Sequence, residues 1–152
     1  MSAREIEDPQ VEAPEQVFGR AAQRAQRMGL PYAGAVTPAE AHRLAQSGAA
    51  QIVDVRTLAE WRDVGHIEGP PLIVWPRDGG ADEVHEFLGH LREAVDPSRP
   101  TLFLCRSGVR SHFAAIVAAS AGFKKAYNIL EGFEGPPGSG QGWRAAGLPW
   151  TK

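Results

Sequence analysis

Short apolar segments alternate along the chain with segments that have the periodicity of amphipathic helices. Four of the short segments read as strands, at 51–55, 71–75, 101–104 and 126–129. Parallel strands need long crossover connections, which helices between successive strands supply. The alternation therefore predicts an α/β fold of three layers, α/β/α, with a mainly parallel central sheet covered by helices on both faces.

Three helices are predicted within this alternation. Thr37 can cap the first of them, which has Pro at its first position, Glu40 in a capping box and Gly48 at its end. Apolar residues at helical spacing predict a second helix over 84–95, and a third over 109–121 leads to a closing glycine. The segment 131–142 is rich in Gly and Pro and is predicted to be a loop.

The chain has 152 residues, enough for one compact domain with a modest extension. We place that domain at 37–150 and an N-terminal extension at 1–36. Residues 1–14 carry acidic residues and prolines and are predicted to be disordered, whereas 15–28 has an apolar face and is predicted to be a helix that packs on the domain.

The charge balance and hydropathy exclude several partners. A formal net charge of −2 gives no electrostatic reason to expect binding to nucleic acid or to an anionic membrane. No stretch approaches the roughly 20 apolar residues of a membrane span, and the acidic N-terminus does not resemble a secretory signal. We therefore expect a cytoplasmic protein, in which a thiol stays reduced. The histidines lack metal-ligand spacing, so no metal and no cofactor are predicted.

Cys105 is the only cysteine in the chain, and it lies between an apolar strand and a helix. Ligands of open parallel sheets bind at the carboxyl ends of strands, where this residue falls. Residues 105–110 are predicted to form a tight loop whose backbone N–H groups, backed by a helix N-terminus, bind an anion. The predicted substrate-binding residues are Arg106, Ser107, Gly108, Val109, Arg110 and Ser111.

An inert, buried cysteine is the alternative interpretation. Such a thiol has no use for Arg106 and Arg110 nearby, or for the polar run that joins them. Both arginines add positive charge in the same turn and favour the anionic thiolate, which is the nucleophilic form of cysteine. We therefore interpret Cys105 as a catalytic nucleophile.

Three motifs resemble those of the rhodanese-like domains. The first is Cys105-Arg-Ser-Gly-Val-Arg-Ser111, and the second combines Asp54-Val-Arg56 with Glu60 and Gly65-His-Ile-Glu-Gly69. The third is the closing pattern Asn128-Ile-Leu-Glu-Gly-Phe133, followed by Gly142-Trp143. The resemblance covers about residues 37–150, with the motifs in the order of that family.

This resemblance implies a sulfurtransferase of the thiosulfate:cyanide type. Cys105 would take a sulfane sulfur from a small donor such as thiosulfate, become a persulfide and pass the outer sulfur on. With no second cysteine in the chain, the acceptor must come from outside: cyanide, a small thiol or a protein thiol. Acceptor choice is expected to lie in the loops 76–82 and 134–141.

The second motif is interpreted as structural support for the loop. Asp54, Arg56 and Glu60 are expected to form charge pairs beside the site, and His66 to hold a positioning or core role. His112 follows the loop directly and can tune Cys105 electrostatically. The resemblance places Trp75 and Phe133 nearest the mouth of the pocket.

Two other functions remain open. Dual-specificity phosphatases and arsenate reductases share this fold, but their loops need five residues between cysteine and arginine, whereas four separate Cys105 from Arg110. A smaller loop suits a single sulfur atom. The chain can alternatively act as a sulfur carrier or binding module that docks to a partner enzyme through residues 1–36.

Overall fold

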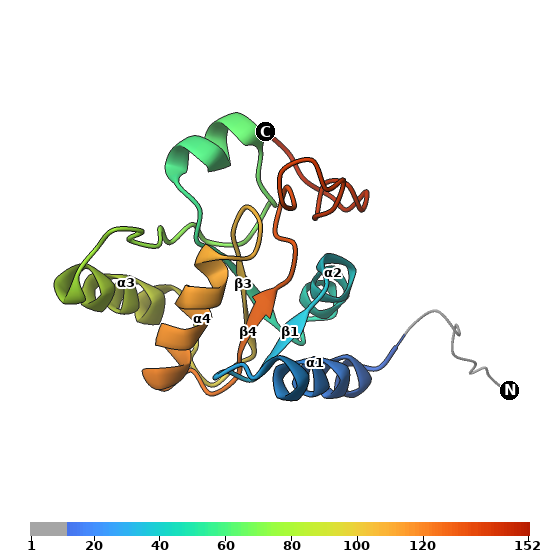
Figure 1. The fold of residues 1–152 in the computed structure, drawn as a ribbon, viewed down its shortest axis with the longest axis horizontal. Helices are drawn as coiled ribbons and strands as arrows, with labels where there is room; N and C mark the ends of the chain where they lie inside the picture. The colour runs from blue at the N-terminus through green and yellow to red at the C-terminus, as the bar shows by residue number, and fades with distance from the viewer. Residues whose placement is uncertain (1–11) are drawn as a thin grey trace, which may run out of the picture.

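The fold is built on one sheet of four parallel strands in the order β1-β4-β3-β2. A computed structural model describes residues 12–152 (Figure 1). The strands are β1 (Gly34–Val36), β2 (Gln51–Asp54), β3 (Thr101–Leu104) and β4 (Ala126–Ile129). The helices are α1 (Pro14–Met28), α2 (Pro38–Gln46), α3 (Ala81–Ala94) and α4 (Arg110–Ser120), with a short π-helix η1 (Glu60–Val64). The predicted α/β fold with a parallel sheet is confirmed.

Helices cover both faces of the sheet and bury a separate apolar core on each side. In Figure 1, α3 and α4 lie on one side, and α1 and α2 on the other. Successive side chains of a strand point to opposite faces. Leu102 and Leu104 of β3 accordingly join the core under α1 and α2, while Phe103 and Cys105 join the core under α3 and α4.

Three local features differ from the sequence predictions. The strand β1 was not predicted, and it lies within the predicted extension 1–36. The segment 71–75 is wrong as a predicted strand, since it makes only one bridge to the sheet, between Leu72 and Asp54. Its prolines explain this, because Pro70 and Pro71 have no N–H to donate. The polar segment before it contains η1 instead of turns alone.

The N-terminal helix α1 is confirmed and is tied to the sheet by arginines. Arg24 donates to the carbonyl oxygen of Ala35 at 2.9 Å and to Glu40 Oε1 at 2.7 Å. Burial by itself would raise the pKa of Glu40, but hydrogen bonds from Arg24 and from the Thr37 backbone outweigh it and lower that pKa to about 2. The predicted disorder of residues 1–14 falls mostly on 1–11, outside the described residues. No helix within residues 12–152 has both the length and the apolar composition of a membrane span.

The packing of α1 on β1 generates a test. A Cβ atom at Gly34 would lie 2.7 Å from the backbone carbonyl group of Ala21, so we expect Gly34→Ala to destabilise the protein by about 1–3 kcal/mol. Gly19 has nothing within 4 Å of its Cβ direction, so Gly19→Ala should stabilise α1 by up to about 1 kcal/mol. Urea unfolding of both variants measures the two effects. Equal stability of the Gly34→Ala variant and the wild type would contradict this close approach.

Candidate active site

The loop after β3 carries the single cysteine at the carboxyl edge of the sheet. The strand ends at Leu104 and α4 begins at Arg110, so residues 105–109 make the whole connection. Gly108 has a φ of 98°, a left-handed value that side chains rarely adopt, and this permits the sharp turn. The structure brings the predicted site residues 105–111 together in this loop and in the first turn of α4.

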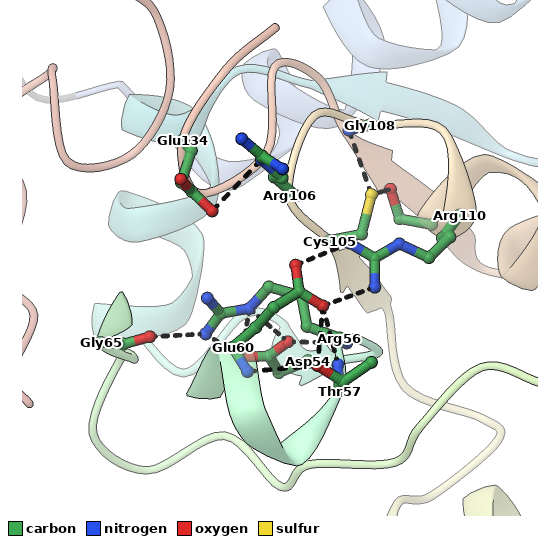
Figure 2. A network of polar contacts seen from close by, with 11 residues as sticks. Asp54, Arg56, Thr57, Glu60, Gly65, Cys105, Arg106, Gly108, Arg110 and Glu134 are labelled. Carbon is green, nitrogen blue, oxygen red and sulfur yellow. Dashed lines mark hydrogen bonds and ion pairs between the residues drawn. The ribbon is translucent and has the colours of Figure 1, made fainter. Parts of the chain in front are cut away.

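The sulfur of Cys105 is buried but has polar neighbours. The residue is 1% exposed and belongs to the core under α3 and α4. The Gly108 N–H donates to Sγ at 3.1 Å, as Figure 2 shows, and the hydroxyl oxygen of Ser111 lies 3.2 Å from Sγ. The sulfur is therefore held in a fixed direction by groups that an inert core thiol would not need.

Backbone N–H groups of the cysteine loop and of the first turn of α4 lack an acceptor within residues 12–152. In the part of the chain that the structure describes, five such N–H groups donate to no acceptor: those of the loop residues Arg106, Ser107 and Val109, and those of Arg110 and Ser111 at the start of α4. Only the Gly108 N–H reaches Sγ itself, so the predicted ring of amides on the sulfur is reduced to one bond. The remaining N–H groups are available to an anion that enters the loop.

Both loop arginines share their charge with a carboxylate. Arg110 donates to the two oxygens of Glu60 at 2.7 and 2.8 Å, and Arg106 lies 3.4 Å from Glu134 (Figure 2). Burial alone would raise the pKa of Glu60, but the hydrogen bonds from Arg110 and Thr57 lower it to about 2. The bond to Glu60 likewise raises the pKa of Arg110. The positive charge expected at the sulfur is therefore partly offset.

A buried ion pair lies beneath the loop. Arg56 is fully buried, and its Nε and Nη2 donate to Asp54 at 2.7–3.2 Å. Nη2 also donates to the carbonyl oxygen of Gly65 at 2.8 Å, and the guanidinium lies 4.4 Å from the ring centroid of Phe133. Phe133 is itself fully buried, so its predicted place at the mouth of the pocket is wrong.

The closing segment packs directly on the cysteine loop. The N–H of Phe133 donates to the carbonyl oxygen of Cys105 at 2.8 Å, and the N–H of Glu134 donates to that of Arg106 at 2.9 Å. Gly132 has a φ of 68°, and a Cβ atom there would lie 2.5 Å from the carbonyl carbon of Arg106. This glycine therefore lets the two segments meet backbone to backbone.

The two histidines singled out from the sequence are engaged elsewhere. The ring of His66 stacks on Trp61 at 3.5 Å between centroids, and its Nδ1 lies 3.0 Å from the Trp61 carbonyl oxygen. His112 Nδ1 lies 2.7 Å from the hydroxyl of Tyr32. Across residues 12–152, no three His, Cys, Asp or Glu side chains are grouped to hold a metal ion.

A pocket of about 410 Å³ opens over the loop. It is lined by Trp75, Arg77, Arg106, Ser107, Val109, Arg110, Phe113 and Pro137. Trp75 thus lies where the resemblance placed it. Arg77 and Pro137 belong to the two loops that were expected to determine acceptor specificity. Their proximity at the mouth of one pocket is visible only in the folded structure. Nothing in the sequence indicated that Phe113 lines the pocket, because an apolar residue early in a helix is normally interpreted as a core residue.

The family model for the Rhodanese-like domain matches residues 37–135, so the chain belongs to this family. The crystal structure of Rv0390 from M. tuberculosis is 41% identical, with a TM-score of 0.68, and covers 78% of this chain and 97% of its own. An uncharacterized Rickettsia prowazekii protein is 38% identical over 102 residues, 65% of this chain and 80% of its own length. Thiosulfate sulfurtransferase 18 of Arabidopsis thaliana is 34% identical over 102 residues, 64% of this chain and 74% of its own. Other relatives are named as tRNA uridine(34) hydroxylases or as a possible tyrosine phosphatase.

The ion pair between Glu60 and Arg110 predicts a pH dependence of stability. The pKa of Glu60 falls from 4.5 to about 2 on folding, so its contribution is fully present above about pH 4.5 and disappears as the pH falls towards 2. Glu60→Gln should therefore lose less stability than the wild type between pH 6 and pH 3. Denaturant unfolding at both pH values measures this loss, with exposed Glu93→Gln as the control. Equal losses in all three proteins would contradict the role given to the ion pair.

Proposed function

We propose that the protein is a sulfurtransferase in which Cys105 carries the transferred sulfur. The thiolate of Cys105 attacks the sulfane sulfur of an anionic donor such as thiosulfate. A sulfur–sulfur bond forms to Cys105, the sulfur–sulfur bond of the donor breaks, and sulfite leaves with the electron pair. A nucleophilic acceptor then attacks the outer sulfur of the persulfide and releases the Cys105 thiolate.

The observation that carries this proposal is the Gly108 N–H on Sγ together with the neighbouring N–H groups of residues 106–111 that have no acceptor. A persulfide ends in an anionic sulfur, which extends from Sγ into the space that these donors surround. Five backbone donors without an acceptor stabilise such a charge as an oxyanion hole stabilises an oxygen. In the persulfide, the Gly108 N–H keeps its hydrogen bond to Sγ of Cys105, the inner of the two sulfur atoms.

The pocket supports a small anionic donor and an external acceptor. Its volume, about 410 Å³, falls in the range of small-molecule sites, and Arg77 and Arg106 both line it. The chain has one cysteine, so no second thiol is present to resolve the persulfide internally. The acceptor is therefore cyanide, a small thiol or the thiol of a partner protein.

Phosphoryl transfer fits the loop less well, although one relative is described as a possible tyrosine phosphatase. A phosphatase loop needs an arginine that faces the bound phosphate. Here only four residues separate Cys105 from Arg110. Both terminal nitrogens of the Arg110 guanidinium donate hydrogen bonds to Glu60, so this carboxylate already engages them. A sulfur atom needs no such arginine.

The direct test of the proposal is intact-mass measurement after incubation with thiosulfate. The wild-type protein should gain the mass of one sulfur atom, and cyanide should remove it as thiocyanate. Cys105→Ser should gain nothing, because it lacks the nucleophile. Phosphatase activity with no sulfur adduct on the wild type would overturn the proposal, and transfer only within a complex with a partner would favour the carrier alternative.

The role of the pocket generates a second test. Arg77→Gln should raise the KM for thiosulfate about three- to tenfold with little change in kcat, because it removes a charge that attracts the donor before the chemical step. Arg27→Gln, on the exposed surface of α1, is the control and should leave both constants unchanged. An unchanged KM in the Arg77→Gln variant would mean that the donor enters by another route.

A further inference from the structure

Behind the loop, Asn128 of β4 forms a hydrogen-bonded series with Ser111 and Cys105. The hydroxyl of Ser111 donates to Asn128 Oδ1 at 2.6 Å and lies 3.2 Å from Cys105 Sγ. Asn128 Nδ2 donates to the carbonyl oxygen of Gly108 at 3.1 Å. Asn128 and Ser111 are 4% and 0% exposed, so water has little access to either side chain.

The directions of these hydrogen bonds with the neutral thiol follow from the partners of the Asn128 amide. Turning the Asn128 amide over would set its oxygen against the Gly108 carbonyl oxygen, two acceptors facing each other. With Oδ1 towards Ser111 at 2.6 Å, a hydrogen must lie between the two oxygens, and only the Ser111 hydroxyl can supply it. The single hydroxyl hydrogen of Ser111 is therefore committed to Asn128.

This commitment determines what Ser111 offers the sulfur. With its hydrogen directed to Asn128, the Ser111 oxygen faces Sγ with a lone pair and can only accept a hydrogen bond. The neutral thiol fits this arrangement, because its S–H can donate to Ser111 while Sγ accepts from the Gly108 N–H. An ionised sulfur does not fit it, because two acceptors would then face each other at 3.2 Å.

We propose that Asn128 is a positioning residue that restrains the ionisation of Cys105 by holding the Ser111 hydroxyl hydrogen away from the sulfur. When the thiol gives its proton to a base in the solvent, the hydroxyl turns from Asn128 to donate to the thiolate. Asn128 Oδ1 then loses its donor in a buried place, which opposes the turn. This inference rests on the proposed role of Cys105 as the nucleophile.

Charged and titratable groups approach this series from several elements. Arg106 belongs to the loop, Arg110 to α4 and Glu60 to η1, while the pair of Asp54 and Arg56 lies beneath. On a further side the hydroxyl of Tyr32 bonds to His112 and also shares a hydrogen bond with the Asn128 side chain. Substitution of Asn128 by an uncharged residue leaves all of these charges in place, so a change in ionisation after it arises from the hydrogen bonds.

The test is the pH dependence of alkylation of Cys105 by iodoacetamide, with each variant checked for folding by circular dichroism. Asn128→Leu is close in shape but offers Ser111 no acceptor, so the midpoint of alkylation should fall by about one pH unit, a tenfold gain in thiolate below the midpoint. In the Ser111→Ala background the same substitution should leave the midpoint unchanged.

A merely structural role for Asn128 gives a different pattern. Loss of the bond to Gly108 would then move the midpoint in Asn128→Leu by the same amount with or without the Ser111 hydroxyl. That pattern, or a midpoint that does not fall in Asn128→Leu, overturns the inference.

A second measurement needs no change at Asn128. Because Cys105 is the only cysteine, the infrared S–H stretching band of the protein belongs to this residue alone. A thiol that donates to Ser111 should absorb at a lower frequency than in Ser111→Ala, and an equal frequency in the two proteins would overturn the inference. Thiosulfate loading of the wild type tests sulfur transfer separately, so normal loading with an unmoved midpoint would reject only the role of Asn128.

Discussion

The buried ion pair between Arg56 and Asp54 holds the carboxyl edge of the sheet together. Its guanidinium bonds to the end of β2, to Gly65 after η1 and, through its face, to Phe133 of the closing segment. Phe133 in turn bonds to the backbone of Cys105. Breaking such a pair by removing one partner leaves an uncompensated buried charge and costs about 3–5 kcal/mol. The loop that carries the sulfur therefore depends on a charge pair that never touches the sulfur.

Main-chain groups, more than side-chain charge, define the electrostatics of the site. Arg110 and Arg106 face Glu60 and Glu134, whereas the Gly108 N–H bonds directly to Sγ at 3.1 Å. Backbone dipoles fixed by the loop need no rearrangement when charge appears on the sulfur. The Ser111 hydroxyl, by contrast, has two settings, and the one observed suits the neutral thiol. Under the function and the inference proposed above, the reactivity of Cys105 reflects a balance between fixed backbone donors and the Ser111 hydroxyl, which can turn.

The sequence was sufficient for features that depend on neighbouring residues. The helix cap at Thr37 and Glu40 and the loop 105–111 are local, so periodicity and spacing predicted them. The contact between Ser111 and Asn128 could not be predicted in this way, because it requires knowing that β3 and β4 are adjacent. The strand β1 has only three residues, too few for a periodic signal. The segment 71–75 bonds to Asp54 and Val55 through Ile73 and Trp75, but Pro71 has no N–H to extend the pairing along β2.

Gly132 has a consequence for comparing this protein with other members of its family. Any side chain at that point would overlap the main chain of Arg106 and Cys105, so the cysteine loop would have to move outwards. The overall sequence identity between two relatives does not reveal such a shift of the loop, whereas the residue aligned with Gly132 does. A relative with a side chain at this position therefore needs its own loop geometry before any mechanism is transferred to it.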